Sequence, residues 1–335
     1  MAFVGSAKPT VSVVLPVRNE GRFIGSVLQE LAEQDFPRGD FEIIVVDGES
    51  TDDTVAIASQ YRDRFDRFQI IENPKRLSSV ARNLGYRAAT GEFILYVDGH
   101  CRIPSMRLLA DMAAMFRQNN VDTLCRPQPQ TAGPQTYFQQ AVSQARSSAL
   151  GHALDSTIYN DQERVVPAAS SGAMYRRDVF YKIGEFDEHF DACEDVEFNT
   201  RIDKAGLKAM ISPRLTIEYA ARTSLRGLFC QLYRYGYGRW QLFCKHPSTL
   251  GIGTLIPVLF VLGLFAPPFL WLVSLEVWLI VSVPYAFYLI AVGAVSLGIT
   301  RKNRKSLIFI LPFIFFTIHF AFGTGFIAAL ARLRR

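Results

Sequence analysis

The first hundred residues alternate between short β-branched apolar runs and segments whose apolar residues recur at helical spacing. Four runs are predicted strands: 11–17, 41–47, 68–71 and 93–97. The segments between them are predicted helices: 21–34, 53–64 and 80–88. This order predicts an α/β fold with a doubly wound, mostly parallel sheet. Such folds bind ligands at the carboxyl ends of their strands, and Asp47 and Asp98 stand there.

Four short polar signatures lie along this framework. They occupy residues 14–20, 45–48, 96–100 and 193–197. The first three fall at or just after a predicted strand, so their side chains are expected at one edge of the sheet. Beyond residue 102 the pattern is less regular. It predicts helices over 106–119 and 196–205, a polar loop over 126–135 and a small-residue turn over 168–173.

Asp98 and His100 project two metal-ligating side chains from a tight turn through Gly99. A carboxylate with an imidazole suits Mn²⁺, and Mg²⁺ is the alternative ion. A divalent ion held there would neutralise the negative charge that grows on a departing diphosphate. The alternative is structural: an aspartate that caps a loop beside a solvated histidine.

Asp47 and Arg82 are candidate ligand-binding residues. A carboxylate at the end of the 41–47 strand can accept a hydrogen bond from a nucleobase N–H or a ribose hydroxyl. It could instead cap the following helix, a role that Ser50 or Asp52 could also fill. The guanidinium of Arg82 suits a diphosphate, although a surface salt bridge is a close alternative.

Glu194 and Asp195 precede a predicted helix, whose N-terminus favours an ionised carboxylate. Transfer to a hydroxyl with inversion needs a base that removes the hydroxyl proton as the oxygen attacks. We assign this role to Asp195, with Glu194 and Glu197 orienting it or contacting acceptor hydroxyls. Simple capping of the helix by acidic residues is the alternative.

Nearly all charge lies before Pro247, and long uncharged runs follow it. The net charge of +5 includes basic residues at 301–305 and at the C-terminus, which flank these runs as in proteins anchored at the cytoplasmic membrane face. No basic and aromatic pattern suggests a nucleic-acid partner. Five scattered cysteines without a Cys-x-x-Cys pair indicate reduced thiols, and the N-terminus shows no signal-peptide pattern.

Three uncharged stretches are long enough to cross a bilayer core of roughly 30 Å. They are 250–273, 277–299 and 306–330. Pro267 and Pro268 could break the first or make it re-entrant. Two crossings would return residues 301–305 to the cytosol, as the positive-inside rule expects. A third would place the C-terminal arginines outside, against that rule.

The preceding segment, 224–246, is aromatic and basic, which suits a helix in the membrane interface. An ordinary amphipathic core helix is the alternative. The expected organisation is therefore a cytosolic domain over 1–223, an interface segment over 224–246 and a transmembrane region of about three helices over 247–335.

Together these motifs resemble the inverting family 2 glycosyltransferases, which have a GT-A nucleotide-sugar-binding fold. The resemblance covers residues 11–240. It implies that Asp47 contacts the nucleobase, that Asp98 holds a metal-bound diphosphate and that Asp195 is the base. The nucleotide-sugar-binding residues that it implies are Pro16, Asn19, Glu20, Asp47, Arg82, Asp98 and Gly172, and Glu197, Arg239 and Trp240 are expected on the acceptor side.

Two positions depart from the family pattern. His100 stands where the metal motif usually ends in aspartate. Processive members carry Gln-x-x-Arg-Trp, whereas here Gly236 replaces the glutamine before Arg239 and Trp240. The second departure argues against a polymerising synthase. The chain looks most similar to the glucosyltransferases that extend lipid-linked repeat units in succinoglycan-type exopolysaccharide synthesis.

These features predict a multi-pass protein of the inner or plasma membrane with a cytosolic catalytic domain. It would transfer a single sugar, expected to be glucose, from a UDP-sugar to a polyprenyl-diphosphate-linked saccharide. One alternative is a polyprenyl-phosphate glycosyl synthase, in which a phosphate attacks and no base is needed. Another is a catalytically silent membrane subunit that keeps the fold for binding.

Overall fold

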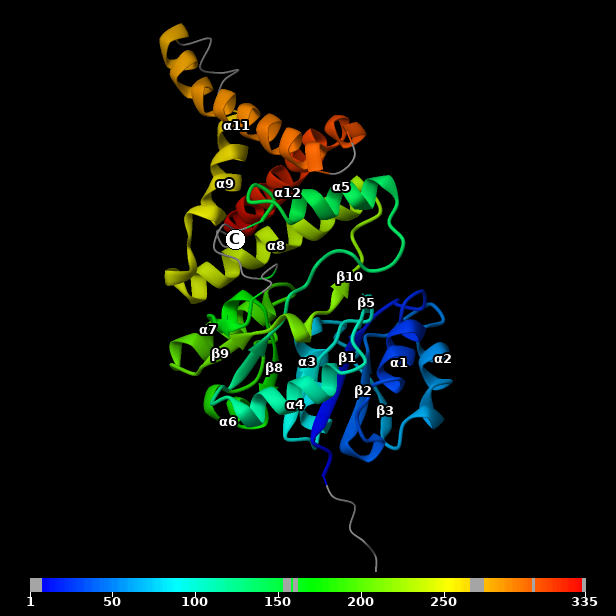
Figure 1. Ribbon diagram of the computed structural model, residues 1–335. Coiled ribbons are helices and arrows are strands. Elements are labelled where there is room, and N and C mark those ends of the chain that lie inside the picture. The colour runs from blue at the N-terminus through cyan, green and yellow to red at the C-terminus, as the bar shows by residue number, and fades with distance from the viewer. Residues whose placement is uncertain (1–7, 153–157, 159–161, 266–273, 303–304, 333–335) are drawn as a thin grey trace, which may run out of the picture. The chain divides into compact units, whose positions relative to one another are not determined.

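The computed structural model describes residues 8–152, 158, 162–265, 274–302 and 305–332 (Figure 1). The chain divides into two compact units. The first unit contains Met1–Gly133 and Thr157–Ala220, and the second contains Pro134–Ser156 and Ala221–Arg335. The second unit therefore takes in residues 134–156, which the sequence grouped with the first 223 residues.

An eight-stranded sheet forms the first unit, in the order β3-β2-β1-β4-β8-β6-β9-β7. The neighbours β3, β2, β1 and β4 are parallel, and β8 joins β4 in the antiparallel direction. The strands are β1 Val11–Val17, β2 Phe41–Asp47, β3 Phe68–Glu72, β4 Phe93–Tyr96, β6 Thr123–Cys125, β7 Arg164–Val165, β8 Gly172–Arg176 and β9 Ala209–Ile211. The prediction of a doubly wound, mostly parallel sheet is confirmed for its first half.

Both faces of this sheet are covered by helices. Because strand side chains alternate between faces, Val13 and Leu15 of β1 face a core with α1 and α4, whereas Val14 faces a second core with α3, α6 and α7. The helices are α1 Ile24–Ala32, α2 Thr54–Ser59, α3 Ser78–Ala88, α4 Leu108–Gln118, α6 Arg177–Ile183 and α7 Glu194–Lys204. A small antiparallel ribbon, β5 Cys101–Arg102 with β10 Glu218–Tyr219, lies beyond β4.

The second unit is helical and is built on close contacts between helices. It contains α5 Tyr137–Arg146, α8 Leu225–Lys245, α9 Ile252–Phe265, α11 Leu275–Lys302 and α12 Leu311–Arg332. A Cβ on Gly236 of α8 would overlap the carbonyl oxygen of Phe322 of α12, and one on Gly323 of α12 would overlap that of Pro257 of α9. These glycines let the backbones approach closely, as small residues do between packed membrane helices.

His319 of α12 joins three parts of this unit. Its Nε2 lies 3.0 Å from the carbonyl oxygen of Leu150, which follows α5. Its Nδ1 lies 2.9 Å from the hydroxyl of Tyr288 on α11. Because a carbonyl can only accept, Nε2 donates to Leu150, and Nδ1 is hydrogen-bonded to the Tyr288 hydroxyl, which can donate or accept. His319 thus links α12 to α11 and to the segment after α5.

Two helices among the described residues are long and apolar enough to cross a membrane, judged by length and composition: Leu275–Arg301 and Leu311–Arg332. The shorter α9 has 14 residues. The helix predicted over 224–246 is present as α8, with Ser224 accepting a hydrogen bond from the Gly227 N–H at its start. The predicted break at Pro267 and Pro268 lies outside the described residues.

Candidate active site

Asp98 lies just beyond β4, at the carboxyl edge of the parallel strands. One of its oxygens, Oδ2, accepts a hydrogen bond of 2.7 Å from the Tyr219 hydroxyl. The other, Oδ1, lies 3.5 Å from a guanidinium nitrogen of Arg82. Burial raises the pKa of Asp98, but Arg82, His100, the Tyr219 hydrogen bond and Arg126 together bring it below its ordinary value. With its side chain 26% exposed, Asp98 is an ionised group open to a ligand.

Arg82, on α3, connects Asp98 with the acidic residues at the start of α7. Its Nε lies 3.2 Å from Glu194 Oε1, and its side chain is only 11% exposed. Its guanidinium also lies over the rings of Tyr96 and Phe186, with its central carbon 5.1 and 5.6 Å from their centroids. Burial alone would lower the pKa of Arg82, but Glu194, Asp98 and Asp195 raise it. The guanidinium of Arg82 therefore links the Asp98 carboxylate to the acidic start of α7 at Glu194.

Glu194 and Asp195 begin α7 and differ in environment. Glu194 is buried, and its Oε1 accepts a hydrogen bond of 2.7 Å from Ser78 as well as one from Arg82. Burial raises the pKa of Glu194 despite the nearby Arg82. Asp195 is half-buried, and one of its oxygens accepts from the N–H of Val196. Asp195 is thus the more accessible carboxylate of the two.

The turn into α7 has a left-handed backbone. Cys193, which precedes Glu194, has φ 64° and ψ 19°. A non-glycine residue rarely adopts this conformation, and surrounding contacts must hold it. Side chains of α3 hold the segment before it. Asn83 exchanges two hydrogen bonds of 2.9 Å with the backbone of Phe186, and Ser79 donates to the carbonyl of Phe190.

Asp47, at the end of β2, is buried and binds the turn that follows it. Its two oxygens accept from the backbone N–H and the hydroxyl of Ser50. The predicted contact with a nucleobase stays a prediction, because these bonds leave room for further donors. The other interpretation, a cap on the next helix, is not what the structure shows, since α2 begins only at Thr54.

Asn19 and Glu20 connect the loop after β1 to the loop after β2. Asn19, with φ 56°, accepts from the Thr51 N–H through its side-chain oxygen, and its own N–H donates to Ser50. The N–H of Glu20 donates to Thr54. These hydrogen bonds hold the two loops together at the edge of the sheet where β2 ends with Asp47.

The Glu20 carboxylate also contacts His100. Its Oε1 lies 2.9 Å from His100 Nδ1. A carboxylate on Nδ1 favours the tautomer that leaves the lone pair on Nε2, an arrangement common around metal-ligating histidines. Glycine is required at position 99, between Asp98 and His100, because a Cβ on Gly99 would lie 2.8 Å from Glu20 Cγ. The turn thus holds His100 beside Asp98.

The remaining predicted residues make other contacts. Glu197 is fully buried, and Arg201 binds both of its oxygens, so its geometry favours an internal ion pair over acceptor contact. Gly172 begins β8, and a Cβ there would lie 2.7 Å from Asn199 Oδ1. Pro16 pairs with Val46 inside the sheet. Arg239 and Trp240 belong to α8 of the second unit, where the Trp240 ring packs against Phe326.

With this geometry established, comparison with known proteins identifies the family. The model of glycosyl transferase family 2 matches residues 12–184. The chain belongs to this family. It is 30% identical over 253 residues to the succinoglycan biosynthesis protein ExoA of Rhizobium meliloti, covering 73% of this chain and 74% of that protein. The resemblance inferred from the motifs is thereby confirmed.

A second relative can be aligned with nearly the whole of this chain. It is the dolichyl N-acetyl-alpha-D-glucosaminyl phosphate 3-beta-D-2,3-diacetamido-2,3-dideoxy-beta-D-glucuronosyltransferase of Methanococcus voltae. The two are 25% identical over 343 residues, which is 96% of this chain and 97% of that protein.

Among solved structures, the mannosyltransferase PcManGT from Pyrobaculum calidifontis, in complex with GDP-Man and Mn²⁺, has a similar fold. Its TM-score is 0.61 at 21% identity, with 97% of this chain and 88% of that chain covered. This likeness supports the GT-A α/β fold.

Two functional-site residues of this glycosyltransferase were not found from its sequence. Arg126 is only 2% exposed and donates to the Tyr96 carbonyl and to the Tyr219 hydroxyl, at 2.7 and 3.0 Å. Tyr219 in turn donates to Asp98. Arg126 lies in the stretch interpreted as a polar loop, and Tyr219 in a two-residue strand, so neither carried a pattern that periodicity could detect.

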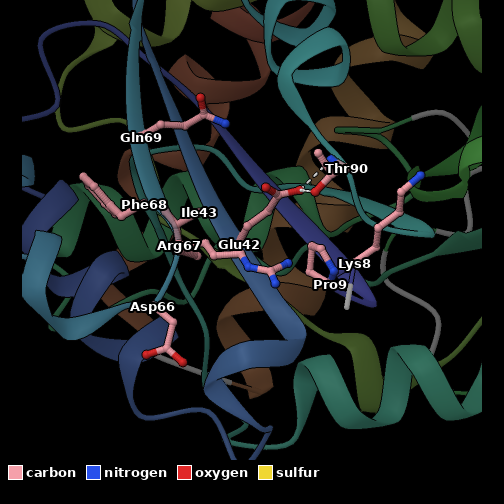
Figure 2. A pocket seen from close by; sticks show the side chains of 9 residues that line it. All are labelled: Lys8, Pro9, Glu42, Ile43, Asp66, Arg67, Phe68, Gln69 and Thr90. Atoms are coloured by element: carbon pink, nitrogen blue, oxygen red, sulfur yellow. Dashed lines mark hydrogen bonds between the residues drawn. The ribbon is translucent and has the colours of Figure 1, made fainter. Parts of the chain in front are cut away.

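An opening of about 550 Å³ lies at the opposite edge of the sheet (Figure 2). It is lined by residues near the amino ends of β1 to β4: Lys8, Pro9, Glu42, Ile43, Asp66, Arg67, Phe68, Gln69 and Thr90. Glu42 there accepts from the hydroxyls of Ser12 and Thr90 and from the Thr90 N–H. None of the predicted site residues lines it.

Proposed function

We propose that this family 2 glycosyltransferase is a membrane-anchored inverting enzyme. It transfers one sugar, expected to be glucose, from a UDP-sugar to a polyprenyl-diphosphate-linked saccharide at the cytosolic face of the inner or plasma membrane. The observation that carries this proposal is the Asp98–Arg82–Glu194 bridge. In this bridge, Arg82 lies 3.5 Å from the carboxylate of Asp98, the proposed donor-side residue, and 3.2 Å from that of Glu194 at the start of α7.

The donor side fits a divalent ion, Mn²⁺ or Mg²⁺, held by Asp98 and His100. Asp98 is ionised and partly exposed, and Glu20 orients the histidine. The described residues contain no group of three or more metal-ligating side chains, so diphosphate oxygens and water would complete the coordination. The ion would neutralise charge on the departing diphosphate. The mannosyltransferase from Pyrobaculum calidifontis was solved in complex with GDP-Man and Mn²⁺, which supports a metal-dependent donor site by analogy.

Asp195 is the proposed base. As the acceptor oxygen bonds to the anomeric carbon, the bond from that carbon to the diphosphate breaks on the opposite face, and Asp195 takes the hydroxyl proton. Glu194 is less suited, because it is buried and bound by Ser78 and Arg82. Its role is to fix Arg82 and the start of α7.

The lipid-linked acceptor is supported by relatives and by the second unit. The Methanococcus voltae relative is named for transfer to a dolichyl-linked sugar phosphate, and the Rhizobium meliloti relative for succinoglycan biosynthesis. The candidate span Leu275–Arg301 is mostly exposed apolar surface, as expected of a helix in contact with lipid.

The test is transfer of labelled sugar from UDP-, GDP- and TDP-sugars into bacterial membrane lipid. It compares the wild type with Asp195→Asn and with Asp63→Asn, a control at an exposed aspartate of the first unit. We expect label from one UDP-sugar in a lipid-linked saccharide, lost only in Asp195→Asn, with UDP binding retained.

Other outcomes would redirect the proposal. Label in a lipid-phosphate monosaccharide would indicate a polyprenyl-phosphate glycosyl synthase. No label from any donor would favour a silent subunit. Loss of UDP binding together with transfer in Asp195→Asn would refute the base assignment.

A further inference from the structure

Asp195 shares one face of α7 with two residues to which the proposed function gives no role. Asn199 and Asp203 follow it at intervals of four residues, and at about 100° per residue such positions lie along one side of a helix. Asn199 is only 2% exposed, and Asp203 is half-buried. Both residues therefore pack against another part of the first unit.

The part that they contact is the segment 168–172, whose last residue begins β8. Asp203 accepts hydrogen bonds from the N–H groups of the first two residues of the segment, at 2.7 and 3.0 Å, one through each carboxylate oxygen. The side-chain amide of Asn199 donates to the carbonyl oxygen of Gly172 at 2.9 Å. Both ends of the segment are thus hydrogen-bonded to α7.

The Tyr175 hydroxyl adds to this contact between β8 and α7. It lies 3.0 Å from Asn199 Oδ1 and 2.8 Å from the Gly172 carbonyl oxygen. Burial raises the pKa of the Tyr175 phenol, Arg82 lowers it, and the charge of Asp195 raises it. The carboxylate of Asp195 therefore lies close enough to interact with the hydroxyl that is bound to the end of the segment.

The segment is also connected to the donor side of the site. Its Ser171 carbonyl accepts a hydrogen bond of 3.3 Å from the Arg126 N–H. The Arg126 side chain donates to the Tyr219 hydroxyl, which in turn donates to Asp98. A series of contacts therefore leads from α7 through the segment to Asp98, and this path does not include Arg82.

We propose that Asn199 and Asp203 are positioning residues of the transfer reaction. They hold the segment 168–172 against α7 and so set the separation of the proposed base from Asp98. The inference rests on the proposed function, in which Asp195 is that base. A displaced base meets the acceptor hydroxyl less often in a reactive geometry. Loss of either positioning residue should therefore lower kcat more than it raises the KM for the donor.

The test compares the full-length wild type with Asn199→Ala, Asp203→Asn and Thr200→Val. Thr200 is the matched control, because it is buried on the same helix and its hydroxyl donates to the Val196 carbonyl within α7. UDP binding counts the folded sites in each preparation. Initial rates of labelled-sugar transfer then give kcat per UDP-binding site and the KM for the donor.

We expect kcat per UDP-binding site to fall about tenfold or more in Asn199→Ala, with donor KM changed less than about twofold. Asp203→Asn should show a smaller fall in kcat, about threefold, because the amide keeps one of the two acceptor oxygens. Thr200→Val should match the wild type. If Asn199→Ala does not bind UDP, Asp203→Asn decides by the same criterion.

Three results would overturn this positioning role and leave the proposed function intact. They are an unchanged kcat in Asn199→Ala and Asp203→Asn, an equal fall in Thr200→Val, and a rise in donor KM at constant kcat. Failure of the proposed function has a different signature. No transfer by the wild type from any donor, or transfer that persists in Asp195→Asn, would refute it.

Discussion

Tyr219→Phe tests how Asp98 is kept ionised and in place. The change removes the hydroxyl that donates to Asp98 at 2.7 Å and accepts from Arg126 at 3.0 Å. A hydrogen bond to a charged group contributes about 1.5–3 kcal/mol. Because Asp98 is 26% exposed, solvent screening reduces that contribution, and we expect a loss of about 1–2 kcal/mol. At about 1.4 kcal/mol for each factor of ten, kcat/KM should fall roughly 5- to 30-fold.

The same change shifts the pH dependence in a defined direction. Burial raises the pKa of Asp98, and the Tyr219 hydrogen bond is one of the contributions that lower it. Without the hydroxyl, the pKa of Asp98 rises, so the carboxylate is protonated at higher pH. The acid limb of the kcat/KM profile should therefore move to higher pH.

The assay is initial-rate sugar transfer from pH 4 to 8 at a fixed Mn²⁺ concentration, with Tyr181→Phe as the matched control. Tyr181 is 76% exposed on α6 and is not one of the site residues. The control should behave as wild type. An unchanged acid limb and unchanged kcat/KM in Tyr219→Phe would show that Asp98 does not depend on this hydrogen bond, and the argument would fail.

Three further predictions concern other parts of the molecule. His100→Ala should raise the Mn²⁺ concentration for half-maximal activity about tenfold, since it removes a ligand that Glu20 orients; an unchanged metal titration would exclude His100 as a ligand. Asn83→Ala removes the two hydrogen bonds to Phe186 and should lower kcat with little change in KM for the donor; a rise in donor KM at constant kcat would contradict this positioning role. Gly236→Ala should lower Tm by several degrees, because its Cβ overlaps the Phe322 carbonyl. Gly298→Ala on α11, with open space around it, is the control for that thermal-unfolding measurement, and equal Tm values would refute the packing argument.

Local patterns were sufficient to predict the first half of the sheet. The runs at 11–17 and 41–47 match β1 and β2, and the run at 93–97 extends one residue beyond β4. Short signatures also located Asp98, which follows β4, and Glu194, which begins α7. Both lie in the cluster that Arg82 connects. These residues were predictable because each signature stands next to a long, strongly periodic segment.

Other features depend on contacts between distant parts of the chain. β5 and β10 have two residues each, too few for any periodicity, yet they bring Tyr219 to Asp98. Glu197 was predicted to orient Asp195 or to contact acceptor hydroxyls. At about 100° per residue, however, positions two apart on a helix point to nearly opposite sides, and Glu197 faces Arg201 instead.

The attachment of residues 185–194 to α3 has a consequence for how this enzyme can diversify. Arg82, Ser78, Ser79 and Asn83 all project from one short, rigid helix, and each contacts that segment. The charged groups therefore keep their spacing as long as α3 stays intact. The polar residues that follow Arg126, 127–135, lie outside α3, and none of their side chains binds these four residues in a hydrogen bond given above. A change elsewhere in the chain that leaves α3 and residues 185–194 intact therefore leaves the spacing of these groups unchanged.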